Sequence, residues 1–370
     1  MRFTIRRSAL ALSLVLAAPL QGQAPPRHAD SVRLVTTDIP NFWRAYDLAA
    51  GRDSAEQVRI FDEVYLRPGS PGLHDLARVR LMNRKTVEGR LAAAGLPPEA
   101  KDSAVGRSYV LHSAAEGLVA TLARAPRYYA GIRPGSLAVD TATAVTGAIR
   151  RGLRRLLELY PEGSLPDVYF LIGDLSTGGT VTRSGMLIGT EQFTAGPDAA
   201  TNEELPPWFR DILVLNTFDR LPGLVLHEAV HSLQPPRRTT TLLEQALVEG
   251  IADFVSELAI GPWHRDTPRQ RYGAANERAV WIDFEDEMAT DSTVRTWMYN
   301  GNVPFPDNHG ASDIGYWVGY AVAREYYRRA GDQRQAIREL ILLRDPERLL
   351  EESGYAAYAK ALPPSGTPPR

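Results

Sequence analysis

Residues 221–258 read LPGLVLHEAVHSLQPPRRTTTLLEQALVEGIADFVSEL, and this stretch carries the main prediction about the fold. Apolar residues recur at helical spacing on both sides of Pro235 and Pro236, which favours two consecutive helices separated by a break. The second helix has a defined start, because Thr241 and Glu244 have the spacing of a capping box. We therefore expect two largely buried helices joined by a short connection.

The first of these helices contains polar side chains in the pattern H-E-x-x-H, formed by His227, Glu228 and His231. Histidines four residues apart lie on the same face of a helix, so both imidazoles can bind one ion. The pattern predicts His227 and His231 as metal ligands and Glu228 as a general base acting on metal-bound water. The alternative is a buried helix with incidental polar residues, but burying those groups without partners is costly.

A third ligand is expected from the second helix, because a catalytic zinc usually has three protein ligands. Glu249 is the candidate, and Gly250 beside it allows another helix to approach closely. Asp253 lies one turn later on the same face, where it can accept a hydrogen bond from a metal-bound histidine. The 370 residues contain no cysteine, which excludes thiolate ligands, disulfides and a lipid-modified cysteine. The expected cofactor is one Zn²⁺ per chain.

Composition and the start of the chain indicate an exported globular protein. Hydrophobic residues make up 44% and charged residues 23%, which excludes a wholly disordered or polytopic membrane protein. A formal charge of −2 with no basic stripe argues against nucleic acid as a partner. A basic start followed by an apolar run predicts a cleaved signal peptide over residues 1–24, with no integral membrane segment after its removal. The expected location is periplasmic or extracellular.

The rest of the chain divides by its hydrophobic periodicity, which predicts a predominantly helical α+β fold. Residues 25–38 are expected to be a leader or linker, and residues 39–165 a helical N-terminal region. Short β-rich runs between glycines, from residue 168 onwards, predict a small sheet before the H-E-x-x-H helix. The region that carries the motif is expected to span residues 166–362, followed by a flexible tail at 363–370.

The segments HEAVH at 227–231 and EGIAD at 249–253 resemble the gluzincin branch of zinc metallopeptidases, most nearly the zinc-dependent protease domains of bacteria. The resemblance implies a zincin-like catalytic core over residues 166–362. It also implies an edge strand that holds the substrate backbone by main-chain pairing. The stretch that fits this position consists of Gly185, Met186, Leu187, Ile188 and Gly189. An ordinary hairpin is the alternative.

A donor to the oxyanion of the reaction is expected downstream, at a turn-rich loop followed by a helix. Tyr316 lies at this junction and is the first candidate, because a phenol can donate a hydrogen bond to the developing charge. Tyr320, one turn later, and His309 in the loop are the other candidates. Packing in the core is the alternative role for both tyrosines.

The function predicted from these residues is an exported zinc metallopeptidase that hydrolyses peptide bonds with Glu228 as general base. Endopeptidase action is favoured, because the G-x-M-E-N signature that binds a free amine in aminopeptidases is missing. Peptides or proteins are the expected substrates. Two alternatives stay open: a non-catalytic zinc-containing scaffold that binds peptide or cell-envelope partners, and a zinc hydrolase of a non-peptide amide. The sequence does not specify the oligomeric state.

Overall fold

The computed structural model describes residues 28–195, 204–302 and 309–364, and the predicted signal peptide lies outside these ranges. The N-terminal helices are α1 (Asp38–Ala49), α2 (Ser54–Ile60), α3 (Pro71–Leu76), α4 (Arg84–Ala93), α5 (Ala104–Arg124), α6 (Pro126–Ala138) and α7 (Thr143–Leu159). Two π-helical turns, η2 (Phe61–Leu66) and η3 (Ala77–Leu81), continue α2 and α3. The remaining short helical turns are η1 (Ala29–Ser31), η4 (Pro98–Asp102), η5 (Thr190–Gln192) and η7 (Phe218–Arg220).

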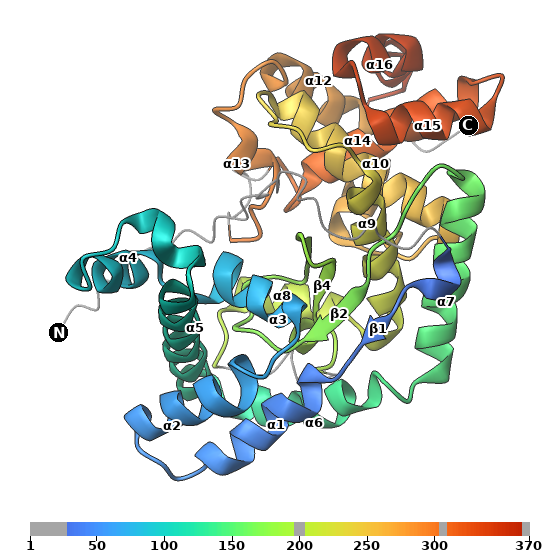
Figure 1. Cartoon of the computed structure of the whole chain (residues 1–370). Coiled ribbons are helices and arrows are strands. Elements are labelled where there is room, and N and C mark those ends of the chain that lie inside the picture. Colours follow the sequence, from blue (N-terminus) through green and yellow to red (C-terminus); the bar gives the residue numbers. More distant parts are fainter. Residues whose placement is uncertain (1–27, 196–203, 303–308, 365–370) are drawn as a thin grey trace.

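The helices of the C-terminal half include the two that carry the motif, α9 (Leu221–Leu233) and α10 (Leu242–Ile260). The others are α8 (Pro207–Leu215), α11 (Pro268–Ala275), α12 (Glu277–Glu287), α13 (Val294–Trp297), α14 (Ile314–Arg329), α15 (Gln333–Leu342), α16 (Pro346–Ser353) and α17 (Tyr355–Ala361). Figure 1 shows α1 to α6 in blue to teal below and to the left of the small sheet, α7 in green to its right, and α12 to α16 in orange and red above it. Within the described ranges, no helix is both long and apolar enough to span a membrane.

The sheet has four strands in the order β1-β2-β4-β3. Its strands are β1 (Leu34–Val35), β2 (Val168–Leu171), β3 (Gly179–Val181) and β4 (Met186–Gly189). β1, β2 and β4 run parallel, with Val168 opposite Met186, and β3 is antiparallel to β4. The structure therefore confirms the prediction of a predominantly helical α+β fold with a small sheet before the motif helix.

The prediction that Gly185 to Gly189 form an edge strand is wrong. β4 lies inside the sheet, between β2 and β3, and all four of its residues are buried. A strand covered on both faces has a continuous apolar sequence and not an alternating one, which is the pattern of Met186, Leu187 and Ile188. Gly185 belongs to the turn before β4, where its φ of +146° favours glycine. The edge near α9 is β3.

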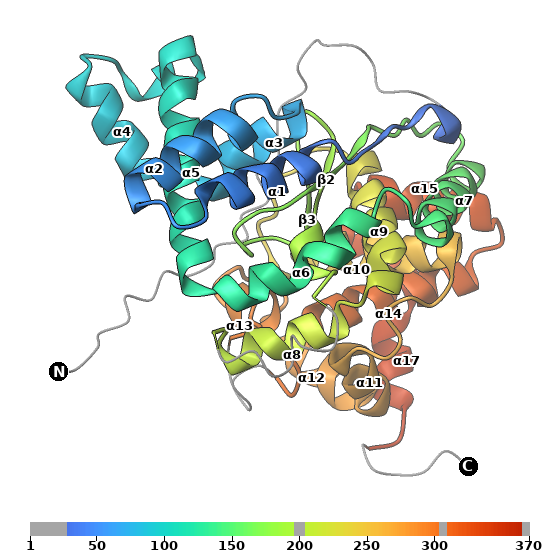
Figure 2. The ribbon, with the colours of Figure 1, turned by 90° about the horizontal axis from the view of Figure 1, so that it is seen from below.

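The N-terminal helices pack against the sheet and share its hydrophobic core. Phe42, Trp43 and Phe61 form an aromatic group with two buried tyrosines whose hydroxyls donate to carbonyl groups just after β2. Tyr65 donates to the carbonyl of residue 172 and Tyr129 to that of residue 173. Seen from below, α1 and α6 lie across this side of the sheet (Figure 2). The segment at 34–35, within the stretch expected to be a leader, pairs with β2 as strand β1. The division of the chain into regions stays a prediction.

Helix α10 packs between α9 and α14, and its backbone comes very close to the backbone of α14. A Cβ atom added at Gly250 would lie 2.1 Å from the backbone of Gly319 and Tyr320 in α14, and one added at Gly319 would lie 1.8 Å from the carbonyl oxygen of Ala246. The capping box of Thr241 and Glu244 is present and fixes where α10 begins. Close packing on one side and a defined start therefore set the position of Glu249 and Asp253 relative to α9.

Candidate metal centre

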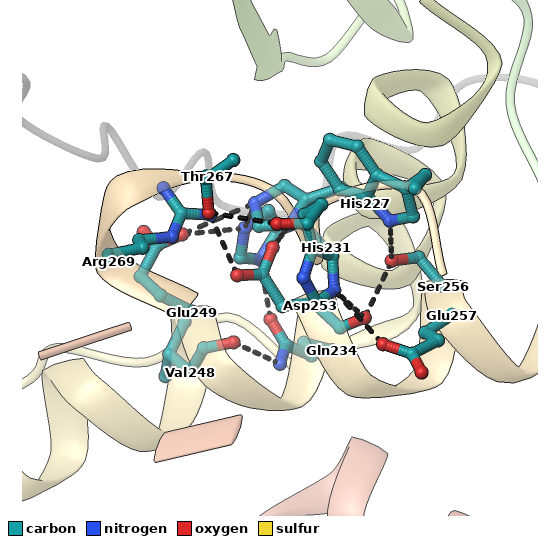
Figure 3. A network of polar contacts seen from close by, with 12 residues as sticks. His227, His231, Gln234, Val248, Glu249, Asp253, Ser256, Glu257, Thr267 and Arg269 are labelled. Carbon is teal, nitrogen blue, oxygen red and sulfur yellow. Dashed lines mark hydrogen bonds and ion pairs between the residues drawn. The ribbon is translucent and has the colours of Figure 1, made fainter. Parts of the chain in front are cut away.

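His227 and His231 from α9 and Glu249 from α10 direct their side chains toward one point (Figure 3). The Nε2 atoms of the two histidines are 3.0 Å apart. The Oε2 atom of Glu249 is 3.3 Å from Nε2 of His227 and 3.2 Å from Nε2 of His231. An ion about 2.0 to 2.1 Å from each of four tetrahedral ligands separates those ligand atoms by about 3.3 Å. The three atoms therefore have nearly the spacing that a zinc site requires.

The outward-facing ring nitrogens of both histidines are already occupied. Nδ1 of His227 is 3.0 Å from Oδ1 of Asp253, and Nδ1 of His231 is 2.7 Å from Oε1 of Gln234. Both partners are acceptors, so each ring donates from Nδ1 and turns Nε2 toward Glu249. When the rings are neutral, two Nε2 lone pairs and one carboxylate meet at one point, an arrangement that suits a metal cation.

The pKa values of the site also favour a positive charge among the ligands. Burial by itself lowers the pKa of His227, but hydrogen bonds to Asp253 and Glu249 and the charges of Asp253 and Glu228 outweigh burial and raise this pKa to about 10. Burial raises the pKa of Glu249, yet the two histidines hold it well below its usual range. In the absence of a metal ion, a proton on the histidines supplies the charge. A metal that binds here displaces that proton.

Three further side chains support the ligands, and the sequence argument missed all of them. Arg269 donates from Nη2 to Oδ2 of Asp253 at 2.8 Å, on the side away from His227. The hydroxyl of Tyr299 donates to Oε1 of Glu249 at 2.6 Å. Gln234, which accepts from His231, follows it by three residues within the same segment, so local spacing offered a signal for it. No sequence signal pointed to Tyr299 or Arg269, because only the tertiary fold brings them to the site.

Glu228 faces a large cleft of about 2190 Å³, and His227, His231 and Glu249 line the same cleft. A Cβ atom added at Gly179 would lie 2.5 Å from Oε1 of Glu228, so the glycine at the start of β3 leaves space for this carboxylate. Within the described residues Glu228 has no hydrogen bond or ion pair, and burial raises its pKa. Among the described residues β3 has one strand neighbour, β4, and its residues Gly179 to Val181 line the cleft.

The three residues predicted as oxyanion donors lie in three different environments. Tyr316 lines the cleft, with its ring 6.4 Å from that of His227 and the guanidinium of Arg269 4.5 Å from its ring centre. Tyr320 lies outside the lining of the cleft and donates to Glu257 at 3.1 Å. His309 stacks on Trp297 at 3.9 Å and is also outside the lining. Of these three, the fold brings only Tyr316 to the metal ligands.

A family model described as gliding motility protein GldB matches residues 138–357, which is more than half of the chain. The chain belongs to the GldB family. No curated protein and no solved structure matches it. All three candidate ligands, together with Glu228 and Asp253, lie within the part that the GldB model matches.

Membership of the GldB family corrects the predicted activity. The interpretation as a gluzincin-type zinc metallopeptidase is wrong, because the matching family is one of gliding motility proteins and not of peptidases. The prediction of an enzyme is wrong for the same reason. Glu228 and Tyr316 therefore have no catalytic assignment. An H-E-x-x-H helix specifies where metal ligands lie, and it does not specify a reaction.

The GldB family is one of cell-envelope lipoproteins, which supports the prediction of an exported protein at this coarser level. Lipoproteins of the envelope carry their lipid on a cysteine. The 370 residues contain no cysteine, so none of them can carry such a lipid. The predicted signal peptide lies outside the described residues.

Proposed function

We propose that this protein is a zinc-containing binding scaffold of the cell envelope that serves gliding motility, and that one Zn²⁺ is held by His227, His231 and Glu249. One observation carries the metal assignment: two histidine lone pairs and a carboxylate oxygen lie within 3.3 Å of one another, and the opposite ring nitrogens are already hydrogen-bonded. The family match supports the role in motility. The expected location is the periplasm or the outside of the cell.

Zinc fits the donor set better than the common hard cations. Two imidazole nitrogens and one carboxylate oxygen suit zinc, whereas Ca²⁺ and Mg²⁺ take oxygen ligands almost exclusively. Three protein ligands leave one position of a tetrahedral ion open toward the cleft. The proposal includes a zincin-like arrangement of this region. It is supported by the position of the helix pair α9 and α10 behind a small mixed sheet.

The partner of the scaffold is proposed to be a peptide or protein segment that enters the cleft in an extended form. The support comes from β3, which within the described part of the chain has a strand neighbour on one side only and lines the cleft from Gly179 to Val181. An extended segment can add to such an edge by main-chain hydrogen bonds. The metal would then lie beside the bound segment, where its open position can accept one ligand atom.

The metal part of the proposal is tested by elemental analysis of the purified protein after zinc is added and excess removed. We expect about one zinc per chain, and a large loss in His231→Ala. His112→Ala is the matched control, because His112 is half-exposed on α5 and is not among the residues that line the cleft. Absence of stoichiometric zinc in the unmodified protein would refute the metal site.

The motility part is tested in a strain that lacks the gene and carries either the unmodified gene or a variant. Spreading on a surface should be restored by the unmodified gene and by His112→Ala, and not by His231→Ala, at matched protein levels. Full spreading of the His231→Ala strain, together with loss of zinc from the purified variant, would separate the metal from motility.

A further inference from the structure

The cleft beside the metal ligands contains an excess of positive side chains. Eight arginines and five acidic residues line it. Two of these arginines are paired within the cleft, Arg33 with Asp167 and Arg269 with Asp253. The remaining excess raises the question of which arginine lacks a partner and lies close enough to the metal ligands to act with them.

Arg80 meets both conditions. It lies on η3, the π-helical turn after α3, and its side chain enters the cleft from the N-terminal helices. The side chain is partly buried, and no described residue forms a hydrogen bond or ion pair with it. Its Nε atom is fully buried without a partner. π-helical turns of this kind are frequent at functional sites.

The surroundings of Arg80 connect it to the metal site. Burial lowers the pKa of Arg80, and Glu228 is the acidic group that opposes this shift most strongly, followed by Asp174 and the hydroxyl of Tyr299. Glu228 follows the ligand His227 directly, and Tyr299 donates to the ligand Glu249. Arg80 therefore lines the same cleft as the three ligands and interacts electrostatically with Glu228 and Tyr299, although it comes from a different part of the chain.

An unpaired guanidinium withdrawn from water is unfavourable unless an anion compensates for it. The guanidinium of Arg80 has no anionic partner among the described residues, so an anionic group of the ligand that occupies the cleft can compensate for it.

We propose that Arg80 binds a carboxylate group of the ligand that occupies the cleft, beside the zinc ion; the inference rests on the zinc site proposed above. The planar guanidinium matches a carboxylate with two parallel hydrogen bonds. The occupant proposed above is a peptide or protein segment, and the common anionic groups of such a segment are carboxylates, so a carboxylate and not a phosphate is the expected ligand group. The carboxylate comes either from the C-terminus of a polypeptide or from an acidic side chain.

The test uses calorimetric titration of the zinc-loaded full chain. Acetate tests binding of the carboxylate group alone, and inorganic phosphate tests binding of the competing anion. Three acetylated tripeptides distinguish the sources: trialanine with a free C-terminus, Ala-Glu-Ala amide, and trialanine amide. We expect acetate to bind more tightly than phosphate, and at least one acidic peptide to bind more tightly than the uncharged one. The tighter acidic peptide identifies the source of the carboxylate.

Variants of Arg80 decide whether this residue is responsible. Arg80→Gln should weaken binding of acetate by about 10-fold or more, the range for hydrogen bonds to charged groups, and Arg80→Lys should weaken it less. The control is Arg238→Gln, an exposed arginine of the same cleft, which should bind acetate as the unmodified protein does. Thermal melting verifies that each variant is folded.

Three results would overturn the proposal: unchanged acetate affinity in zinc-loaded, folded Arg80→Gln; tighter binding of phosphate than acetate; or equal binding of the acidic and uncharged peptides. Metal analysis of the same samples keeps this outcome separate from failure of the zinc site. A protein that binds no zinc refutes the proposed function, whereas a zinc-loaded protein without dependence on Arg80 refutes only the carboxylate site.

Discussion

The replacement Asp253→Asn tests how strongly the surroundings of the ligands determine metal binding. Asp253 is completely buried and uses both oxygens: Oδ1 lies 3.0 Å from Nδ1 of His227, and Oδ2 accepts from Arg269 at 2.8 Å. Asparagine has one oxygen and no charge. It can accept from only one of the two partners, and its amide group must face the other, which is also a donor.

Two losses of different size follow from this geometry. A hydrogen bond to a metal-bound histidine is typically worth about 10- to 100-fold in metal affinity, which corresponds to about 1.4 to 2.7 kcal/mol. The metal-free protein should also lose stability, because Arg269 is left without its carboxylate. The side chain of Arg269 is only 19% exposed, and breaking a buried pair costs about 3 to 5 kcal/mol. The retained oxygen of asparagine favours the lower end of that range.

Competition with a chelator of known affinity measures the first loss, and denaturant unfolding of the metal-free protein measures the second. Glu257→Gln is the control, because Glu257 lies one turn further along α10 and contacts the hydroxyl of Tyr320 and not the ligands. If Asp253→Asn and Glu257→Gln both give the zinc affinity of the unmodified protein, Asp253 does not orient His227, and the reasoning about its role is refuted.

Three further predictions concern other parts of the molecule. Tyr299→Phe removes the hydroxyl that donates to Glu249 at 2.6 Å and should lower zinc affinity by roughly 10-fold in the same competition assay; unchanged affinity would contradict the support we assign to this hydroxyl. Gly319→Ala places a Cβ atom 1.8 Å from a carbonyl oxygen of α10 and should reduce the free energy of unfolding by about 1 to 3 kcal/mol, whereas Gly331→Ala, with open space around it, should not. Burial raises the pKa of Glu191 to about 8, above its value in the unfolded chain, so its contribution to stability is complete below about pH 4.5 and is lost as the pH rises toward 8. Denaturant unfolding across this pH range should show a smaller decline in Glu191→Gln than in the unmodified protein, and identical pH profiles would count against a buried, protonated Glu191.

The parts of the fold and the site that depend on local spacing were predictable from the sequence. The two helices follow from apolar periodicity and the capping box of Thr241, and the i, i+4 spacing of His227 and His231 places both rings on one face. The hydrogen bond from His227 to Asp253 required the additional inference that the two helices pack together. Gly250 indicated a close approach, although the helix that approaches it is α14.

What depends on tertiary arrangement was not predictable in this way. Strand order is not a local property, so the sequence predicts an edge strand at 185–189 although residues 186–189 lie inside the sheet as β4. Tyr299 follows Glu249 by 50 residues and reaches it from a left-handed backbone conformation with φ of 55°, which is rare for an aromatic residue. The activity was also misjudged, because one arrangement of metal ligands occurs in proteins with unrelated roles.

The cleft is lined by two stretches of the chain, of which the family model matches one. The segment 138–357 that the GldB family model matches supplies His227, Glu228, His231 and Glu249, whereas Arg80 comes from helices that precede the match. Substitutions in the earlier helices can therefore alter which ligand the cleft selects while the ion-binding side chains stay as they are. The proposed metal centre and the proposed carboxylate site therefore depend on separate stretches of the chain, and each can be altered by substitution without changing the side chains of the other.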